Sequence, residues 1–414
     1  QSLSLGSMGA DSSDLDNDLL TDLIVTEMLP KSLKRKKTKA IYESWDKYSL
    51  ANSKGYYHQF PRNVLQRNYG PSGFLEIGRY SGVSATDWSW ASMIFDMDND
   101  GLRDVFIANG IYKDLLDRDY LAYMANTERI RNMIKTEEEV IKKLIDIMPS
   151  KAIKNIAYKN NGEFNFTEFS DAWGFDLPTF SNGMSYGDLD NDGDLDIVIN
   201  NVNMPALVYK NNSSIDENKS ISFELIGREK NKNAIGSKII IKYGNNKQSM
   251  IENFPSRGFQ SSIPNRLHFG VGNVKEIDSA IIYWPNNKVS YHANLETNKT
   301  HKIKQDESDY EYFDMANYSN LNLKLNEIEL FNFKHNENKF IDFNKERLLT
   351  QMYSNEGPAL AKGDVNNDGI IDFFIGGAKG ESSAIFISKN NQYEKIIDPF
   401  SKKSAAEDVV AEFF

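Results

Sequence analysis

The sequence contains no cysteine, and this absence excludes several kinds of site. A thiol nucleophile, a zinc–thiolate centre and a disulfide framework all require cysteine. Histidine is scarce as well: there are five in 414 residues, none in a His-Glu-x-x-His motif, so a zinc hydrolase is disfavoured. No apolar run approaches the ~18 residues that a membrane-spanning helix needs. We therefore expect no transmembrane segment in this chain.

Positive charge is also in short supply. The chain has 48 lysines and arginines against 59 aspartates and glutamates, for a net charge of −11. Such a chain is poorly suited to nonspecific nucleic-acid binding or polybasic membrane contact, so we expect no nucleic-acid partner. Hydrophobic residues make up 40% of the sequence, which is typical of a folded protein and not of a disordered one.

What the sequence has instead is an acidic motif, Asp-x-Asp/Asn-x-Asp-x-x-x-Asp, that occurs four times. We name the copies the first, second, third and fourth acidic loops: residues 14–22, 96–104, 188–196 and 364–372. The second and third copies belong to a longer repeat with an offset of 92 residues, which also aligns Asn63 with Asn155 and Gly70 with Gly162. This alignment indicates that a structural unit has been duplicated.

Each unit has the pattern of short β-strands. Residues 64–65 and 156–158 precede Asn/Gly turns, and residues 74–76 and 166–168 follow them. Every acidic loop leads into a short apolar run, at residues 23–25, 105–107, 197–199 and 373–375. Short strands repeated in units are typical of β-propeller blades. Residues 114–150 interrupt the pattern, and the spacing of leucine and isoleucine within 129–148 predicts a helical insertion.

The acidic loops have the chemistry of a calcium site. Calcium takes six to eight oxygen ligands, and positions 1, 3, 5 and 9 of each loop supply side-chain oxygens, with a backbone carbonyl near position 7. Glycine at position 6 permits a positive φ. Leu19 stands there in the first loop, at a cost of ~1–2 kcal/mol. The predicted ligands are Asp14, Asp16, Asp18, Asp22, Asp96, Asp98, Asp100, Asp104, Asp188, Asp190, Asp192, Asp196, Asp364, Asn366, Asp368 and Asp372.

Other interpretations of the acidic loops are less consistent with the sequence. An EF-hand needs Glu at position 12 and flanking helices, but position 12 is Val25, Ile107, Ile199 or Ile375. Asp-rich turns without an ion are the remaining alternative, since Asp favours turns. Crowding several carboxylates into one short loop without a cation is, however, unfavourable. A carboxylate cage saturates its metal, so we expect structural and not catalytic calcium ions.

The same residues resemble known families. The acidic loops, the Asn-x-x-x-x-Asn-x-Gly turns and residues 374–378 are similar to FG-GAP/VCBS repeats, the blades of integrin-α-type β-propellers. Residues from about 222 to 303 resemble the ASPIC/UnbV domain, on the basis of Asn233-Ala-Ile-Gly236, Gly258-Phe-Gln-Ser261, Leu267-His-Phe-Gly270 and Tyr283-Trp284-Pro285. The combination resembles the cartilage-acidic-protein-like family in its bacterial surface form. Departures from the family pattern are Leu19 and Asn286-Asn287.

This resemblance implies a mostly β fold with four parts. Residues 1–213 are expected to hold the C-terminal blades of a first, incomplete propeller, with the insertion 114–150. Residues 214–305 are expected to form an ASPIC/UnbV-like β domain. Residues 306–356 would then be a linker and the start of a second propeller, and residues 357–414 its first, truncated blade. The resemblance also implies that the sequence is a fragment, with a signal sequence and further blades outside it.

The function that the resemblance implies is a noncatalytic, calcium-stabilised binding or adhesion scaffold, extracellular or outer-membrane-associated, with a glycan or protein ligand. Two alternatives stay open: a propeller-based, calcium-dependent polysaccharide-active enzyme, and a partner module of an outer-membrane uptake or secretion complex. Gly183-Met-Ser185-Tyr-Gly187 matches the Gly-x-Ser-x-Gly nucleophile elbow. That elbow needs a helix after it, whereas a strand is expected here, so we expect no catalytic residue in this motif.

Overall fold

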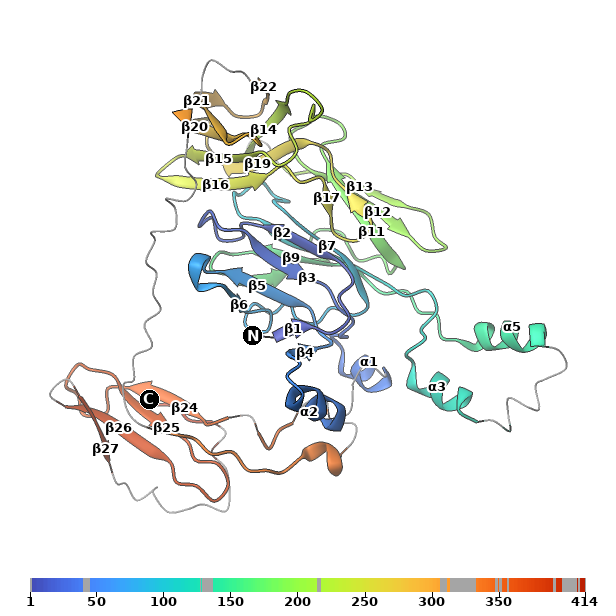
Figure 1. Cartoon of the computed structure of the whole chain (residues 1–414), viewed down its shortest axis with the longest axis vertical. Coiled ribbons are helices and arrows are strands. Elements are labelled where there is room, and N and C mark those ends of the chain that lie inside the picture. The colour runs from blue at the N-terminus through green and yellow to red at the C-terminus, as the bar shows by residue number, and fades with distance from the viewer. Residues whose placement is uncertain are drawn as a thin grey trace. The chain divides into compact units, whose positions relative to one another are not determined.

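The computed structural model describes residues 2–39, 45–126, 128, 137–213, 217–305, 311–312, 333–346, 349, 352–355, 357–389, 392–396, 408 and 410–413. They belong to two compact units, Gln1–Leu323 and Lys324–Phe414, which we describe in turn. Strands dominate both units (Figure 1), which confirms the expected mostly β fold. Among these residues, no helix combines the length and the apolar composition that crossing a bilayer demands.

The first unit contains three similar antiparallel sheets whose strands pair in chain order. Sheet one joins β2 (Ala10–Ser13), β3 (Asp22–Val25), β5 (Val64–Asn68) and β6 (Phe74–Glu76); sheet two joins β7 (Ser89–Phe95), β8 (Asp104–Asn109), β9 (Ile156–Asn160) and β10 (Phe166–Glu168); sheet three joins β11 (Ser181–Gly187), β12 (Asp196–Asn201) and β13 (Leu207–Tyr209). The strands expected on either side of the turns and after the acidic loops are therefore confirmed.

The second unit contains sheet four, which repeats this order. It joins β24 (Leu360–Gly363), β25 (Asp372–Ile375), β26 (Ala384–Lys389) and β27 (Gln392–Ile396). In all four sheets the acidic loop connects the first strand to the second in one register, with position 9 opposite the residue that precedes position 1. These pairs are Ser13↔Asp22, Phe95↔Asp104, Gly187↔Asp196 and Gly363↔Asp372.

Sheet two is buried on both faces, between sheets one and three. Ile94, Val105 and Ile107 belong to a buried cluster with residues of β3 and β5, whereas Met93 and Phe106 belong to a second cluster with residues of β11 and β12. All six residues of β8 are buried. A strand with two buried faces is apolar throughout and does not alternate, which explains the continuous run at residues 105–107.

The β14–β22 region of the first unit forms a separate core between two sheets. One has the order β19 (Arg266–Gly272), β14 (Lys219–Ile226), β22 (Thr300–Lys304); the other has the order β16 (Lys247–Glu252), β15 (Lys238–Tyr243), β20 (Glu276–Tyr283), β21 (Lys288–Glu296), β23 (Glu311–Tyr312). Phe223, Phe269 and Trp284 are buried in this core. The Trp284 Nε1–H donates to Ser290 Oγ (3.0 Å), so the indole is packed without an unpaired donor.

A small hairpin of this region reaches the first strands of all three sheets. It is formed by β17 (Ser256–Arg257) and β18 (Ser261–Ser262). Arg257 forms a buried ion pair with Asp11 of β2, and its Nη2 also donates to the carbonyl of Ile94 in β7 (3.4 Å). The Met184 N–H of β11 donates to Ser261 Oγ (3.1 Å). The hairpin therefore ties the three sheets together at their first strands.

The helices lie in the connections between strands. α1 (Leu33–Thr38) and α2 (Trp45–Ser53) lie between β3 and β5. In the same connection, β4 (His58–Phe60) pairs in parallel with β1 (Ser2–Ser4). α3 (Arg118–Met124) and α5 (Glu137–Ile147) lie within residues 114–150, between β8 and β9. The predicted helix 129–148 is thus confirmed where the structure describes it; residues 129–136 lie outside the described residues. Short 3₁₀ turns occur at Gly70–Ser72 and Asp342–Asn344. Most of the predicted linker 306–356 also lies outside the described residues.

One buried arginine joins the acidic loops to the β14–β22 region. Arg103, in the second acidic loop, donates from Nη1 to the carbonyl of Asp14 in the first loop (2.7 Å). Its Nη2 donates to the carbonyl of Met250 (2.6 Å) and to Ser249 Oγ (2.9 Å), both in β16. A single guanidinium therefore holds two loops and one strand together, and its five donors make it suited to this role.

We expect Arg103→Met to lower the free energy of unfolding of the first unit by about 3 kcal/mol, because it leaves two buried carbonyls and a hydroxyl without donors. This corresponds to a fall of at least about 4 °C in the thermal midpoint. The matched control is Arg228→Met, at an exposed arginine, which should change stability by less than about 0.5 kcal/mol. Equal midpoints for the two variants would contradict the bridging role.

Candidate metal centres

The four acidic loops share one backbone conformation. Position 6 has a positive φ in every loop: 70° at Leu19, 94° at Gly101 and Gly193, and 82° at Gly369. Leu19 thus adopts the left-handed conformation that glycine adopts elsewhere, and we expect it to be strained by ~1–2 kcal/mol. Position 4 is left-handed as well, with φ between 58° and 63° at Asn17, Asn99, Asn191 and Asn367. Asparagine tolerates this conformation better than most residues, and its presence in all four copies was a signal that the sequence analysis did not use.

The aspartate at position 9 fastens each loop to its sheet. One carboxylate oxygen accepts the backbone N–H of position 2, as Asp104 Oδ2 does from Met97 (3.0 Å). The other accepts a backbone N–H from the third strand or just after it, as Asp104 Oδ1 does from Asn160 (2.9 Å). The same two bonds occur at Asp22, Asp196 and Asp372, at 2.8–3.0 Å. This aspartate closes the loop, whether or not an ion is bound.

The aspartate at position 1 orders the loop interior. Asp96 Oδ2 accepts the N–H of Gly101 (2.8 Å), and the two oxygens of Asp14 accept the N–H groups of Asp18 (3.1 Å) and Leu19 (3.0 Å). In the fourth loop, Asp364 accepts the corresponding two N–H groups, at 3.0 Å and 2.7 Å. These bonds orient the carboxylate at position 1 toward the backbone N–H groups of positions 5 and 6.

Several of these carboxylate oxygens are buried without any hydrogen-bond partner. They are Asp16 Oδ1, Asp96 Oδ1, Asp98 Oδ1 and Asp188 Oδ1. Asp96 itself is only 6% exposed. A buried, unpaired carboxylate oxygen is costly, and a cation removes that cost. The residues present therefore fit a hard, oxygen-preferring ion such as calcium.

The structure brings most, but not all, of the predicted ligands together in the first three loops. Carboxylate oxygens lie within 4.8 Å of one another in three groups: Asp14, Asp16 and Asp18; Asp96, Asp98 and Asp104; Asp188, Asp190 and Asp192. The predicted ligands Asp22, Asp100 and Asp196 are not members of these groups. The fourth loop is exposed from Asp364 to Ile371, and Asn366 Nδ2 donates to Asp368 Oδ2 (2.8 Å).

Burial dominates the electrostatics of the first two loops. It raises the pKa of Asp96 well above the ordinary aspartate range, and the neighbouring charges of Asp100 and Asp98 raise it further. Burial raises the pKa of Asp104 in the same way. In the first loop, burial raises the pKa of Asp14 to about 6 and that of Asp22 to about 7. Without a cation these sites hold protons more readily than an ordinary aspartate does.

Basic side chains at one equivalent position contact the first three loops. Arg67 Nη2 lies 2.8 Å from Asp16, Lys159 Nζ lies 2.8 Å from Asp100 and also pairs with Asp98, and Lys210 Nζ lies 3.3 Å from Asp192 and also pairs with Asp190. The sequence analysis missed these residues. A signal existed, because the offset of 92 aligns Arg67 with Lys159.

Consecutive loops are joined to each other and covered by the β14–β22 region. Asn17 Nδ2 donates to the carbonyl of Gly101 (3.0 Å), and Asn99 Nδ2 donates to that of Gly193 (3.3 Å). Gly270 of β19 packs so closely on the second loop that a Cβ there would overlap Asp96 Oδ2. The loops of the first unit therefore form an internal interface with this region.

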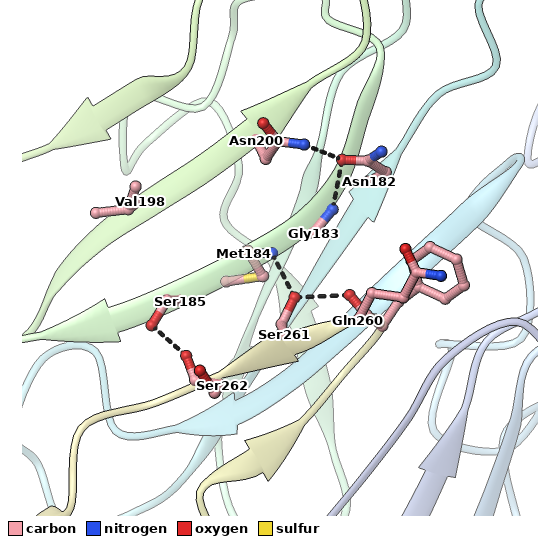
Figure 2. Close-up of a pocket in the computed structure, with 10 residues that line it drawn as sticks. Asn182, Gly183, Met184, Ser185, Val198, Asn200, Gln260, Ser261 and Ser262 are labelled. Carbon is pink, nitrogen blue, oxygen red and sulfur yellow. Dashed lines mark hydrogen bonds between the residues drawn. The ribbon is translucent and has the colours of Figure 1, made fainter.

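A small cavity of about 290 Å³ lies where β11 and β12 meet the hairpin β17–β18 (Figure 2). Its polar groups are uncharged: Asn182, Asn200, Gln260, Ser185 and neighbouring serines. Asn182 Oδ1 accepts from both Gly183 N–H (2.7 Å) and Asn200 Nδ2 (2.8 Å). Ser185 lies within β11 and donates its hydroxyl to the carbonyl of Ser262 (2.7 Å). The acidic loop and strand β12 follow it, as expected, in place of the helix of a nucleophile elbow.

The region that covers the loops of the first unit matches a known protein family. Residues 227–309 match the ASPIC and UnbV family model. This confirms the predicted ASPIC/UnbV domain. The match includes β15 to β22, and β14 completes the same core, so we call the β14–β22 region the ASPIC/UnbV domain. No curated protein sequence matches the chain.

A buried histidine of the ASPIC/UnbV domain contacts the second loop. His268 Nε2 lies 2.7 Å from Asn99 Oδ1, and Nδ1 lies 3.2 Å from Ser222 Oγ. His268 is thus a buried, hydrogen-bonded residue of the packing between this domain and the loop. Burial lowers the pKa of His268 to about 4, and the charge of Arg266 adds to the effect. The imidazole is therefore neutral in the folded protein at neutral pH.

We expect His268 to make the first unit less stable as the pH falls. Its folded-state pKa of about 4 lies below the ordinary 6.5, so the stability it contributes is present above pH 6.5 and is lost as the pH falls toward 4. The loss is about 2 kcal/mol between pH 6.5 and pH 5. Urea unfolding at the two pH values should show that His268→Gln removes this difference. The exposed His58→Gln is the control; if both variants retain the wild-type pH dependence, the assignment is wrong.

Proposed function

We propose that this chain is a noncatalytic, calcium-stabilised scaffold that acts outside the cell or at its surface and binds a glycan. The observation that carries the proposal is the set of buried, unpartnered carboxylate oxygens in acidic loops that recur in one register. A bound ion at each loop supplies positive charge and a cross-link between the first and second strands of its sheet.

The residues that would hold calcium are those at positions 1, 3 and 5 of each loop. In the second loop these are Asp96, Asp98 and Asp100, with Asp104 completing the carboxylate group. The aspartate at position 9 keeps its two backbone hydrogen bonds and has further lone pairs free for the ion. Because these carboxylates enclose the ion, it acts on stability and not as a Lewis acid.

We further propose that the four sheets are blades of FG-GAP/VCBS β-propellers, sheets one to three from one propeller and sheet four from a second. Three features support this: the antiparallel order in sequence, the shared loop register, and the face-to-face packing of sheet two between its neighbours. The hairpin β17–β18 lies along the first strands of all three sheets, which are the inner strands of a propeller.

The chemistry of the cavity beside β11 supports a glycan ligand at that place. Amide and hydroxyl groups without charge suit the hydroxyls of a neutral sugar, and Phe259, which also lines the cavity, offers an apolar ring face. The ring of Phe259 packs at 4.8 Å from that of Trp90, which holds it in place. The second acidic loop, by contrast, is covered by the ASPIC/UnbV domain at Gly270 and does not offer a free recognition face there.

We expect millimolar calcium to raise the thermal midpoint of the whole chain by several degrees relative to excess EDTA. Sites of extracellular affinity, at ~10⁻⁴ M, contribute about 2 kcal/mol each in ~2 mM calcium. Asp96→Asn should keep the midpoint in EDTA or raise it, because the amide resembles the uncharged carboxyl that burial favours. The same variant should reduce the calcium-induced shift.

Differential scanning fluorimetry at pH 7.5 measures both midpoints. Asp171→Asn is the matched control, since it removes the same charge from an exposed aspartate whose only described ion pair is with Lys154. A chain that melts at the same temperature with and without calcium would refute the calcium role. An undiminished shift in Asp96→Asn would exclude the second loop as a site.

For the ligand, we expect the wild-type chain to bind to a glycan array and the variants Asn200→Ala and Gln260→Ala to lose this binding. Both side chains are exposed, so neither change should move the thermal midpoint by more than about 1 °C. The control is Asn212→Ala, at an exposed asparagine away from the cavity. Asn298→Ala is unsuitable as a control, because the Asn298 side chain accepts a hydrogen bond from the Ser220 N–H. Retention that is equal in all variants would move the ligand site elsewhere, and capture of a membrane protein without glycan binding would favour a protein ligand.

A further inference from the structure

The basic residues on the first three acidic loops occupy one structural position. Arg67, Lys159 and Lys210 each stand directly before the residue whose backbone N–H donates to the position-9 aspartate of the loop. Their side chains extend from the third strand, or from the residue directly after it, to the carboxylate at position 3, and the two lysines also reach the carboxylate at position 5. The contact is therefore built into the repeat and is not an accident of one surface.

The fourth loop lacks this cation. The residue whose N–H donates to its position-9 aspartate is Ser388, and the preceding residue is Ile387. Across the described residues we find no ion pair to the carboxylates of this loop. Its carboxylates instead accept from backbone N–H groups and from Asn366. In the part of the chain that the structure describes, three loops thus have an internal cation and the fourth does not.

The internal cation and a calcium ion use the same carboxylate groups. Lys159 Nζ contacts one oxygen, Oδ2, of Asp98 and of Asp100, which are positions 3 and 5 of the second loop and would be calcium ligands there. A calcium ion held by the same carboxylates lies close to the ammonium group, and the two positive charges repel at that separation. Calcium can therefore bind fully only if the lysine withdraws.

Resting on the calcium role proposed above, we propose that Arg67, Lys159 and Lys210 are internal competitors of calcium that lower the affinity of the first three loops. In the absence of calcium they neutralise the carboxylates and keep the loops folded. When calcium binds, these basic side chains move away from the carboxylates. The competition sets the calcium concentration at which each loop changes from the form paired with its basic residue to the calcium-bound form.

The three competitors differ in how firmly they are held. The Arg67 guanidinium lies 4.8 Å from the ring centres of both Tyr69 and Phe164, so it is packed in place. The side chain of Lys159 is 21% exposed and that of Lys210 is 57% exposed. Surface pairs are screened more strongly by solvent, so Lys210 is the weakest competitor. Of the two lysines, Lys159 is therefore the stronger competitor.

The test measures calcium binding to the full chain by equilibrium dialysis with radioactive calcium, at constant ionic strength. Lys159→Met should tighten the dissociation constant of one site on the order of tenfold, and Lys210→Met that of another site by only a few-fold. The matched control is Lys154→Met, which removes the same charge from the same segment but leaves only the exposed Asp171 unpaired. It should leave binding unchanged.

A second measurement separates competition from a purely structural role. Because Lys159→Met removes the cation that pairs with Asp98 and Asp100, the thermal midpoint of the variant should fall below that of wild type in EDTA. In saturating calcium the midpoint should return to the wild-type value or exceed it. A structural role alone would lower both midpoints equally and would overturn the proposal. Lys159→Gln provides a second, polar variant in case the methionine variant does not fold.

The outcomes distinguish this inference from the calcium role itself. If wild type binds calcium and Lys159→Met binds it equally tightly, the competition is refuted and the calcium role stands. If wild type does not bind and Lys159→Met does, the lysine replaces calcium in the native chain and the competition is upheld. If neither binds at millimolar calcium, both are refuted.

Discussion

Burying aspartates is the constraint on which the first unit depends. Asp96 and Asp104 of the second loop are almost fully buried, and burial raises the pKa of both. Such groups persist in a fold only if donors or cations surround them. The surrounding structure supplies both: backbone N–H groups from the loop and the third strand, and the positive charge of Arg103 near Asp96. The acidic loops thus specify where neighbouring strands and charges must lie.

The loop aspartates divide this work between them. Position 9 uses both oxygens to join the loop to the third strand, which explains why one register recurs in sheets that share few other residues. Positions 1, 3 and 5 face the turn interior, and it is there that oxygens remain unpartnered. The loop is therefore closed by hydrogen bonds and completed by a cation. Under the competition proposed above, such a fold keeps its sheet geometry when calcium takes the place of the basic side chain.

The sequence predicts the local structure well because local structure depends on local chemistry. The acidic motif, the apolar run after it and the turns before Phe74 and Phe166 each determine their own backbone, and the structure has the strands that they indicate. The buried Trp284 of the ASPIC/UnbV domain follows from the same kind of pattern. The contacts of Arg67 and Lys159 could also have been predicted, since the two residues align in the repeat. A basic residue before an asparagine is, however, an ordinary feature of an exposed turn and does not by itself indicate such a contact.

The contacts between distant segments could not be predicted in this way. Arg103 reaches Met250 across 147 residues, and His268 reaches Asn99 across 169. The sequence around each residue does not indicate which distant residue it contacts, because the contact depends on how two folded surfaces fit together. Gly270 shows the closeness of that fit, since any side chain there would overlap Asp96. Under the proposed function, a calcium ion in the second loop therefore lies at the base of the ASPIC/UnbV domain and stabilises its docking as well as the loop. This couples the calcium occupancy of the loop to the position of the hairpin β17–β18, and through it to the cavity where we place the ligand.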